Sequence, residues 1–268
     1  MKSIELLPLL AALAGAAVVV PAQAGRSCDG RKPTVQTIER GLALAQRTMA
    51  ALDASGAQVV VLARAGQDLS RYGVRYSHLG FAYRRADPDG AGQWRVVHKL
   101  NQCGTSDSAL YRQGLGEFFL DDLWRYEAAW VLPSPALQQA LLPLLQDDRR
   151  AALLHRRAYS IVSYAWGRKY QQSNQWAIET MAAALEPDVS SRERAQAWLQ
   201  FKGYEPTALR LGPLTRLGGR MSAANVAFDD HPDAKRFADR IETVTVDSVF
   251  SWMNRAQLGG VPVVLRLP

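Results

Sequence analysis

The sequence has few cysteines, few histidines and no second long apolar run, and each shortage narrows the classes of protein that it can encode. Its 268 residues include 2 cysteines and 4 histidines, so at most one disulfide can form within the chain. After residue 20 no apolar stretch approaches the roughly 20 residues that cross a bilayer. Internal repeats, low-complexity segments and runs of one charge are also missing, which excludes solenoid and collagen-like architectures.

The remaining composition is that of a folded chain. Hydrophobic residues make up 48% of the sequence and charged residues 21%, which is enough to bury a substantial core and too apolar for a disordered tail. No segment has the composition of a linker, so we expect a single globular domain over residues 25–268 with helical N- and C-terminal extensions.

The first 24 residues have the pattern of a secretory signal peptide. Lys2 gives a short basic start, an apolar stretch follows over 6–20, and small residues precede Gly25 in an A-x-A arrangement. We therefore expect cleavage near Ala24 and a mature chain that is not an integral membrane protein. Periplasmic and extracellular locations both fit this leader.

The two cysteines are Cys28 and Cys103, and an oxidising compartment favours a disulfide between them. Closing a loop of about 75 residues would stabilise the fold by on the order of 4 kcal/mol in the chain-entropy model. The alternative is a reactive thiol at Cys103, which precedes an expected helix start at Ser106 where a thiolate would be favoured.

The formal net charge of +7 is spread evenly along the chain. A nucleic-acid-binding protein usually concentrates its basic residues on one element, so we expect no nucleic-acid partner. Weak attraction to acidic envelope surfaces is the expected consequence of this charge.

Hydrophobic periodicity predicts helices before, between and after a small antiparallel sheet, which is an α+β fold. Apolar residues at helical spacing predict helices over 34–53, 106–126, 135–145, 147–163, 173–185, 190–201 and 247–257. Short or alternating apolar runs predict strands over 58–63, 76–83, 93–100, 130–132 and 242–246. The segment Asp87-Pro88-Asp89-Gly90 predicts a turn between the second and third strands, and 204–232 is expected to be irregular chain with brief strands.

Two histidines are expected to meet on this sheet. In the strand over 76–83, alternation puts His78 on one face with Gly80 and Ala82, whose small side chains leave room beside an imidazole. The position midway between His78 and His98 falls in the turn, so an antiparallel hairpin places the two side chains opposite or diagonal to each other. They either line a shared functional pocket or are two structural histidines.

A polar run, Gln172-Ser173-Asn174-Gln175, opens the helix predicted over 173–185. Unpaired N–H groups and the helix dipole favour negative charge at this end, so a nucleophile at Ser173 would lie beside an oxyanion site. One histidine could then take its proton while the other orients the first. The alternative is that Ser173 caps the helix or contacts a ligand, since serine is among the best N-cap residues.

Three motifs follow one another along the chain: His-x-Gly on a strand, Val-Val-His-Lys-Leu on the next, and a polar tetrad that opens a helix. In this order they resemble the permuted papain-like hydrolases and acyltransferases related to NlpC and to lecithin retinol acyltransferase. The resemblance covers roughly residues 74–185 and implies a permuted papain-like fold, with the Ser173 helix packed against the His78 face of the sheet. It implies that His78 is the base, that His98 orients it, and that Ser173 is the nucleophile where those enzymes have cysteine. Gln172, Asn174 and Gln175 would then bind the ligand beside Ser173.

Longer segments, including Ser-Arg-Tyr-Gly-Val-Arg-Tyr-Ser-His and Tyr-Gln-Gln-Ser-Asn-Gln-Trp, are similar to a family of exported bacterial proteins of unknown function. The two resemblances imply an exported papain-like domain that acts on or binds an acyl or amide group, such as a cell-wall peptide or a lipid. A hydroxyl is much harder to ionise than a thiol. The alternative is therefore a noncatalytic periplasmic binding or assembly protein that keeps the cleft.

We expect no cofactor, because the sequence has no phosphate-binding glycine loop, no Gly-x-Ser-x-Gly and no His-Glu-x-x-His. Asp229-Asp230-His231 is not expected to form a metal site, because the neighbouring Pro232-Asp233 is typical of a solvated loop and no second cluster with ligand spacing exists. His155 is expected to lie on an exposed helix face. The expected partner is a small molecule, a peptide or a lipid, and the sequence leaves the oligomeric state open.

Overall fold

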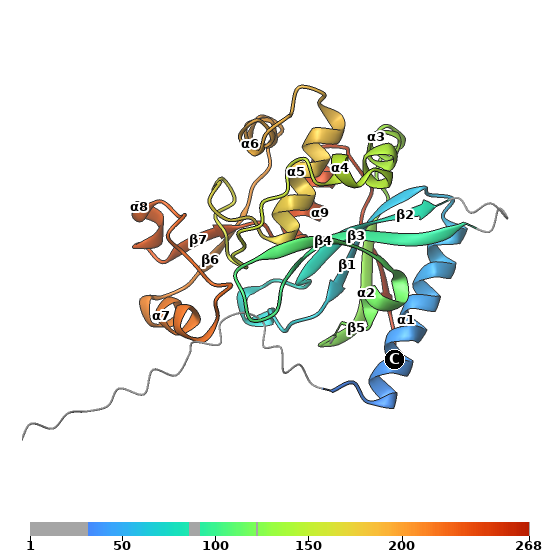
Figure 1. Cartoon of the computed structure of the whole chain (residues 1–268), viewed down its shortest axis with the longest axis horizontal. Coiled ribbons are helices and arrows are strands. Elements are labelled where there is room, and N and C mark those ends of the chain that lie inside the picture. Colours follow the sequence, from blue (N-terminus) through green and yellow to red (C-terminus); the bar gives the residue numbers. More distant parts are fainter. Residues whose placement is uncertain (1–31, 86–91, 122, 268) are drawn as a thin grey trace, which may run out of the picture.

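The computed structural model describes residues 32–85, 92–121 and 123–267, and a six-stranded antiparallel sheet lies at its centre (Figure 1). The strand order across this sheet is β4-β3-β2-β1-β5-β8. Its strands are β1 (Val59–Ala65), β2 (His78–Arg85), β3 (Gln93–Asn101), β4 (Ser108–Gly114), β5 (Arg125–Val131) and β8 (Val263–Arg266). A second sheet pairs β6 (Thr207–Arg210) with β7 (Arg240–Thr243).

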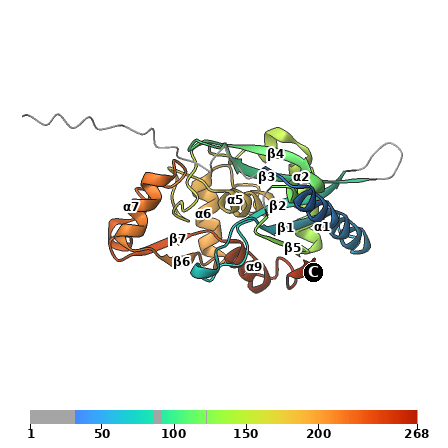
Figure 2. The ribbon, with the colours of Figure 1, turned by 90° about the horizontal axis from the view of Figure 1, so that it is seen from below.

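Helices cover both faces of the large sheet. One face is covered by α1 (Val35–Ala54) and α2 (Leu115–Phe119). The other is covered by α3 (Pro135–Gln146), α4 (Asp148–Ala151), α5 (Ser173–Leu185), α6 (Arg192–Phe201) and α9 (Val246–Arg255). Two further helices, α7 (Pro213–Ser222) and α8 (Asp233–Arg236), accompany the small sheet, and α7 lies with it at the end of the molecule away from α1 (Figure 2).

The central strand β1 is buried along its whole length, which explains its unbroken apolar start. Val59, Val61 and Ala63 belong to the core beneath α3 and α5. Val60 and Leu62 belong to the core beneath α1 and α2. Because alternate residues of a strand face opposite sides, a helix layer on each face requires apolar side chains at both sets of positions.

The predicted α+β class is confirmed, and several predicted elements are found at their expected positions. The helix predicted over 173–185 coincides with α5, and the helix over 135–145 with α3. At the start of α1, Thr34 and Thr37 form a reciprocal capping box, which fixes the helix start that the sequence predicted.

Two predicted helices are wrong because their residues pair with neighbouring backbone. The segment predicted as one helix over 106–126 contains β4, α2 and the start of β5, since Ser108–Gly114 hydrogen-bonds along β3 as an edge strand. The helix predicted over 147–163 ends at Ala151. Beyond it the chain runs beside 106–108, where the Ser108 amide donates to the Arg157 carbonyl and the Tyr159 amide to the Ser106 carbonyl. Long-range pairing here overrides the local helical pattern.

Other expectations are corrected in part or fall outside the described residues. The region 204–232, expected to be irregular, contains β6 and also the helix α7, whose Gly218 and Gly219 are residues typical of turns. The leader over 1–24, Cys28 and the turn at 87–90 lie outside the described residues. Cys103 follows β3, and no free thiol is found among the described residues; the bridge to Cys28 stays a prediction. Within the described chain, no helix is both long and apolar enough to cross a membrane.

Candidate functional site

His78 and His98 meet at one end of the large sheet. His78 begins β2, and the antiparallel register of β2 and β3 pairs Phe81 with Val97, so the two histidines lie diagonally across the strand pair. Their rings are joined by a 2.8 Å contact between His78 Nε2 and His98 Nδ1. The predicted meeting of the two imidazoles is thus confirmed.

Gly80 makes this meeting sterically feasible. A Cβ atom at Gly80 would lie 2.8 Å from His98 Cβ and 3.0 Å from the Val97 carbonyl oxygen, closer than carbon atoms normally approach. Glycine is therefore required beside the His98 ring, as the small residues of this strand suggested.

The surroundings of His98 determine which nitrogens carry protons. His98 is fully buried, and burial, followed by the nearby Arg64 guanidinium, lowers its pKa to about 3. Its ring is therefore neutral at physiological pH. Its Nε2 lies 2.8 Å from Gln113 Oε1, and because an amide oxygen only accepts hydrogen bonds, Nε2 carries the proton. His98 Nδ1 then accepts from His78 Nε2–H, so His78 carries a proton on Nε2 and its Nδ1 is the ring nitrogen that faces away from His98.

The histidine pair lies on the α2 face of the sheet. The Phe118 ring of α2 packs against both imidazoles, with ring centroids 6.0 Å from His78 and 5.3 Å from His98. Helix α5 packs on the opposite face, where the Trp176 ring lies 5.7 Å from the Phe81 ring. The expectation that the Ser173 helix packs against the His78 face is therefore wrong, because Phe81 and His78 point to opposite sides of β2.

Ser173 reaches the same region from the first turn of α5. The N-cap is Gln172, whose side-chain oxygen accepts from the Asn174 amide at 3.1 Å. The Ser173 hydroxyl instead donates to the Lys99 carbonyl oxygen at 2.7 Å and lies 3.5 Å from the Tyr159 hydroxyl. The interpretation of Ser173 as the helix cap is therefore wrong, and its side chain connects α5 to β3.

The polar residues around Ser173 hold the helix start in place. Asn174 Oδ1 accepts from the Leu79 amide at 3.1 Å, and its Nδ2 donates to the Val244 carbonyl at 3.2 Å. Gln172 Nε2 donates to Thr243 Oγ1 at 3.0 Å. Asn174 and Gln172 thereby connect α5 to β2 and to the small sheet.

Gln175 has a different environment from the other predicted binding residues. It is fully buried, its Oε1 accepts from the Ser163 hydroxyl at 2.8 Å, and its Nε2 donates to the Ala165 carbonyl at 3.1 Å. These contacts fix the loop before α5, and Gln175 does not reach the cavity described next.

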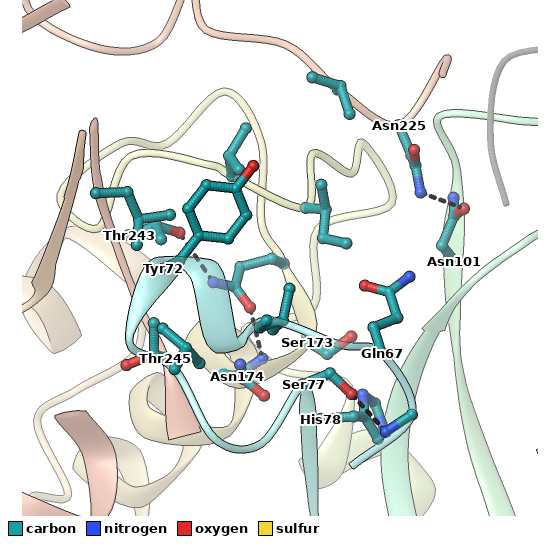
Figure 3. A pocket seen from close by; sticks show the side chains of 18 of the residues that line it. Gln67, Tyr72, Ser77, His78, Asn101, Ser173, Asn174, Asn225, Thr243 and Thr245 are labelled. Carbon is teal, nitrogen blue, oxygen red and sulfur yellow. Dashed lines mark hydrogen bonds between the residues drawn. The ribbon is translucent and has the colours of Figure 1, made fainter. Parts of the chain in front are cut away.

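A cavity of about 680 Å³ is lined by His78 and by the start of α5. Figure 3 shows His78, Ser77, Ser173 and Asn174 gathered in one part of it. The small sheet and its neighbours also line the cavity, with an apolar cluster of Leu209, Leu211, Val226 and Phe228. The cavity therefore offers polar groups at the start of α5 and an apolar surface at this cluster.

Further lining residues carry polar chemistry that the sequence analysis missed. Arg64, almost fully buried, donates to the Phe118 carbonyl and to Asp121, and its guanidinium lies 4.7 Å from the Phe118 ring centroid. On the rim, Asn225 Nδ2 donates to Asn101 Oδ1 at 3.1 Å (Figure 3). An arginine inside the apolar run of β1 was the signal that could have identified the first of these.

The other two histidines lie away from the cavity. His231 is buried and its Nδ1 lies 3.0 Å from Asp230 Oδ1, whereas its neighbours Pro232 and Asp233 are exposed, as expected. His155 follows α4 in a turn, where burial, and then the charge of Lys99, lowers its pKa to about 4. Among the described residues, no group of three or more His, Cys, Asp or Glu side chains could hold a metal ion.

The fold and the site together define an α+β protein in which a buried histidine, His98, supports a second one, His78, that lines a cavity between a large and a small antiparallel sheet. The chain belongs to the family described as an uncharacterized protein conserved in bacteria (DUF2145), whose model matches residues 51–253. That match includes His78, His98 and Ser173, and it confirms the predicted membership of a bacterial family of unknown function. No curated protein and no solved structure matches the chain.

Proposed function

We propose that the cavity binds an amphipathic small molecule, peptide or lipid through an acyl or amide group. The observation that carries this proposal is the chain of contacts from Gln113 through His98 to His78, which ends at the cavity. It fixes the orientation of the His78 ring at the cavity wall, where the imidazole can interact with a polar group of a ligand. The apolar wall around Leu209 and Phe228 would hold the hydrocarbon part of the same ligand.

A second candidate function is acyl transfer or hydrolysis at Ser173, as in the permuted papain-like enzymes that the sequence resembles. Ser173 and His78 line one cavity, and this shared location favours the second candidate. In the reaction, the Ser173 Oγ–H proton passes to His78 Nδ1 while Oγ bonds to the carbonyl carbon of the ligand. The leaving amine or alcohol departs with that proton, and water then hydrolyses the acyl-serine.

This reaction requires a movement of the Ser173 side chain. The hydroxyl donates to the Lys99 carbonyl oxygen, so it must release that bond before it can donate to His78. The resting arrangement therefore favours binding as the primary function, and catalysis depends on a ligand that displaces the hydroxyl from Lys99.

The location of the protein belongs to the same proposal. The signal peptide pattern over 1–24 and the pair Cys28 and Cys103 support export to the periplasm or the medium, where the disulfide would form. A ligand from the cell wall or from a membrane lipid would be available in either compartment.

Binding can be tested with a dansylated N-lauroyl amide, which carries both an acyl chain and an amide. Leu211→Trp places a large side chain in the cavity wall, whereas Leu217→Trp makes the same change on the exposed side of α7, where Leu217 is 55% exposed. We expect the wild type and Leu217→Trp to bind the probe, and Leu211→Trp to bind it about tenfold more weakly or worse. Equal binding by both tryptophan variants, if folded, contradicts the proposal.

Catalysis is tested separately with a serine-reactive fluorophosphonate probe. Labelling that is lost in Ser173→Ala and in His78→Gln would support the second candidate. Absence of labelling in a protein that binds the dansylated amide would leave binding as the function and exclude Ser173 as an active nucleophile.

A further inference from the structure

A second concave region lies beside the cavity, where β5 pairs with the C-terminal strand β8. It is a groove of about 340 Å³ lined by Arg75, Arg125, Arg266, Glu127 and Trp124, among others. We call it the arginine groove, after its three arginines. Val74 lines both the groove and the cavity, so the two regions are separated by little more than the backbone that leads into β2.

The three arginines converge on one buried carboxylate. Glu127 is fully buried, and Arg75 Nε lies 2.8 Å from its Oε1. Arg266 Nε donates to Oε2, and Arg125 Nε lies 3.7 Å from that oxygen. Burial alone would raise the pKa of Glu127, but hydrogen bonds from Arg75 and Tyr76 outweigh it and lower the pKa. The carboxylate is therefore ionised.

The groove has more positive charge than its carboxylate can balance. Three guanidinium groups face a single carboxylate, which leaves two positive charges among the lining residues. Two further carboxylates, Asp247 and Asp68, accept hydrogen bonds from the Arg75 amide at 3.1 Å and from the Ser70 hydroxyl at 2.6 Å. These neutral donors do not cancel the charge of the two carboxylates, but neither carboxylate lines the groove. The lining residues themselves therefore keep an excess of positive charge that can attract an anion.

The guanidinium groups also keep donors for a ligand. The Arg75, Arg125 and Arg266 side chains are 39%, 37% and 60% exposed, so their outer nitrogens reach the groove. The Nε atom of Arg125 is buried without a hydrogen-bond partner among the described residues. Since each guanidinium has five N–H donors, the contacts to Glu127 use only part of what the three side chains offer.

We propose that the arginine groove binds a phosphate group, carried either by a soluble metabolite or by a lipid headgroup. Guanidinium forks match the spacing of phosphate oxygens and bind them bidentately. Two excess positive charges suit a phosphate dianion better than a carboxylate. Trp124, 46% exposed with the Arg125 guanidinium 4.9 Å from its ring centroid, provides an apolar flank for the group that carries the phosphate. This site does not depend on His78 or Ser173.

The test is calorimetric titration of the full chain with inorganic phosphate at low ionic strength. We expect binding that weakens about tenfold or more in Arg125→Gln and in Arg266→Gln. Arg240→Gln is the matched control, because Arg240 is 62% exposed and pairs with Glu242 in the small sheet, and it should bind phosphate within about twofold of the wild type. Arg266→Lys keeps the charge but loses the fork, so it should bind with intermediate affinity.

Three results would overturn the site. These are no heat of phosphate binding by the wild type, equal weakening in the control Arg240→Gln, and acetate binding as tight as phosphate. Urea denaturation verifies that each variant is folded. If Arg125→Gln does not fold, the test rests on Arg266→Lys, because the Arg266 side chain is exposed and its replacement should not disturb the fold. Soluble glycerol 3-phosphate and phosphatidylcholine vesicles containing phosphatidic acid then distinguish the two sources, and binding to either one in an Arg266-dependent manner supports the site.

Discussion

The hydroxyl of Ser173 donates its hydrogen bond to the main-chain oxygen of Lys99, 2.7 Å away. This bond connects the first residue of α5 to β3, while Asn174 connects the second residue to the β2 amide of Leu79. Ser173 therefore has two properties at once: it fixes the helix on the sheet, and it lines the cavity that His78 also lines.

Ser173→Ala should lower the stability of the fold. The Lys99 carbonyl oxygen would lose its donor from Ser173 in a buried place, and the expected cost is about 1–3 kcal/mol of unfolding free energy. Urea denaturation measures it, with Ser190→Ala as the control, because Ser190 is exposed. A Ser173→Ala variant as stable as Ser190→Ala would show that the Lys99 contact contributes nothing.

Ser173→Cys should reveal whether His78 can activate a nucleophile at this position. The start of a helix and a neighbouring imidazole both favour a thiolate, so the thiol pKa should fall well below about 8.5. It should rise again when His78→Ala is added. The pH dependence of iodoacetamide modification at position 173 measures both values. A thiol of ordinary pKa that does not respond to His78 would contradict the catalytic candidate and leave the binding proposal intact.

Gly80→Ala should disturb the histidine pair directly. Its Cβ would lie 2.8 Å from His98 Cβ, so strands β2 and β3 must shift, at an expected cost of about 1–3 kcal/mol. Gly218→Ala in α7 is the matched control, because nothing lies within 4 Å of its added Cβ. Alanine there should leave stability unchanged or raise it by up to about 1 kcal/mol. Equal thermal midpoints for the two variants would show that Gly80 is not sterically required.

The sequence was sufficient to predict the histidine pair, because strand alternation and the turn predicted midway between His78 and His98 indicated which side chains could meet. It was not sufficient for the placement of α5. The pattern of β2 shows two faces, with His78 on one and Phe81 on the other, but both are covered by helices, so the pattern does not indicate which helix covers which face. The small-sheet side of the cavity was also missed in part, because Leu209 of β6 and Phe228, which precedes α8, are far from His78 in sequence and line the same cavity only in the folded chain.

The role of Ser173 shows a second limit. Serine at the start of a helix is typical of an N-cap, yet Gln172 holds that position and Ser173 bonds across to β3. Local preference ranks serine above glutamine for the cap. Gln172 occupies the N-cap position because its side chain bonds to Thr243 and to the Asn174 amide. The contact with Thr243 depends on how the small sheet packs against α5.

The free energy of unfolding should decrease as the pH is lowered, and His98 accounts for part of this decrease. Its pKa is about 3 in the folded protein, against an ordinary value of 6.5, so between these values the unfolded chain binds more protons than the folded one. The contribution is complete above pH 6.5 and is lost as pH falls towards 3, at up to about 1.4 kcal/mol per pH unit for one proton. Urea denaturation across this range should give a shallower pH dependence for His98→Gln than for the wild type. Unchanged pH dependence would show that His98 is not held neutral.

The coupling of His98, His78 and a bound ligand is tested most directly by the long-range proton–nitrogen NMR spectrum of the protein labelled with ¹⁵N-histidine, recorded with and without the dansylated N-lauroyl amide. His78→Gln assigns the His78 signals, and His155, which does not line the cavity, is the internal reference. We predict that His98 is neutral with its proton on Nε2, that His78 carries a proton on Nε2, and that the His78 Nδ1 signal shifts on ligand binding while the His155 signals stay unchanged. A His78 signal that ignores the bound ligand, or a His98 ring protonated on both nitrogens at neutral pH, would contradict this prediction.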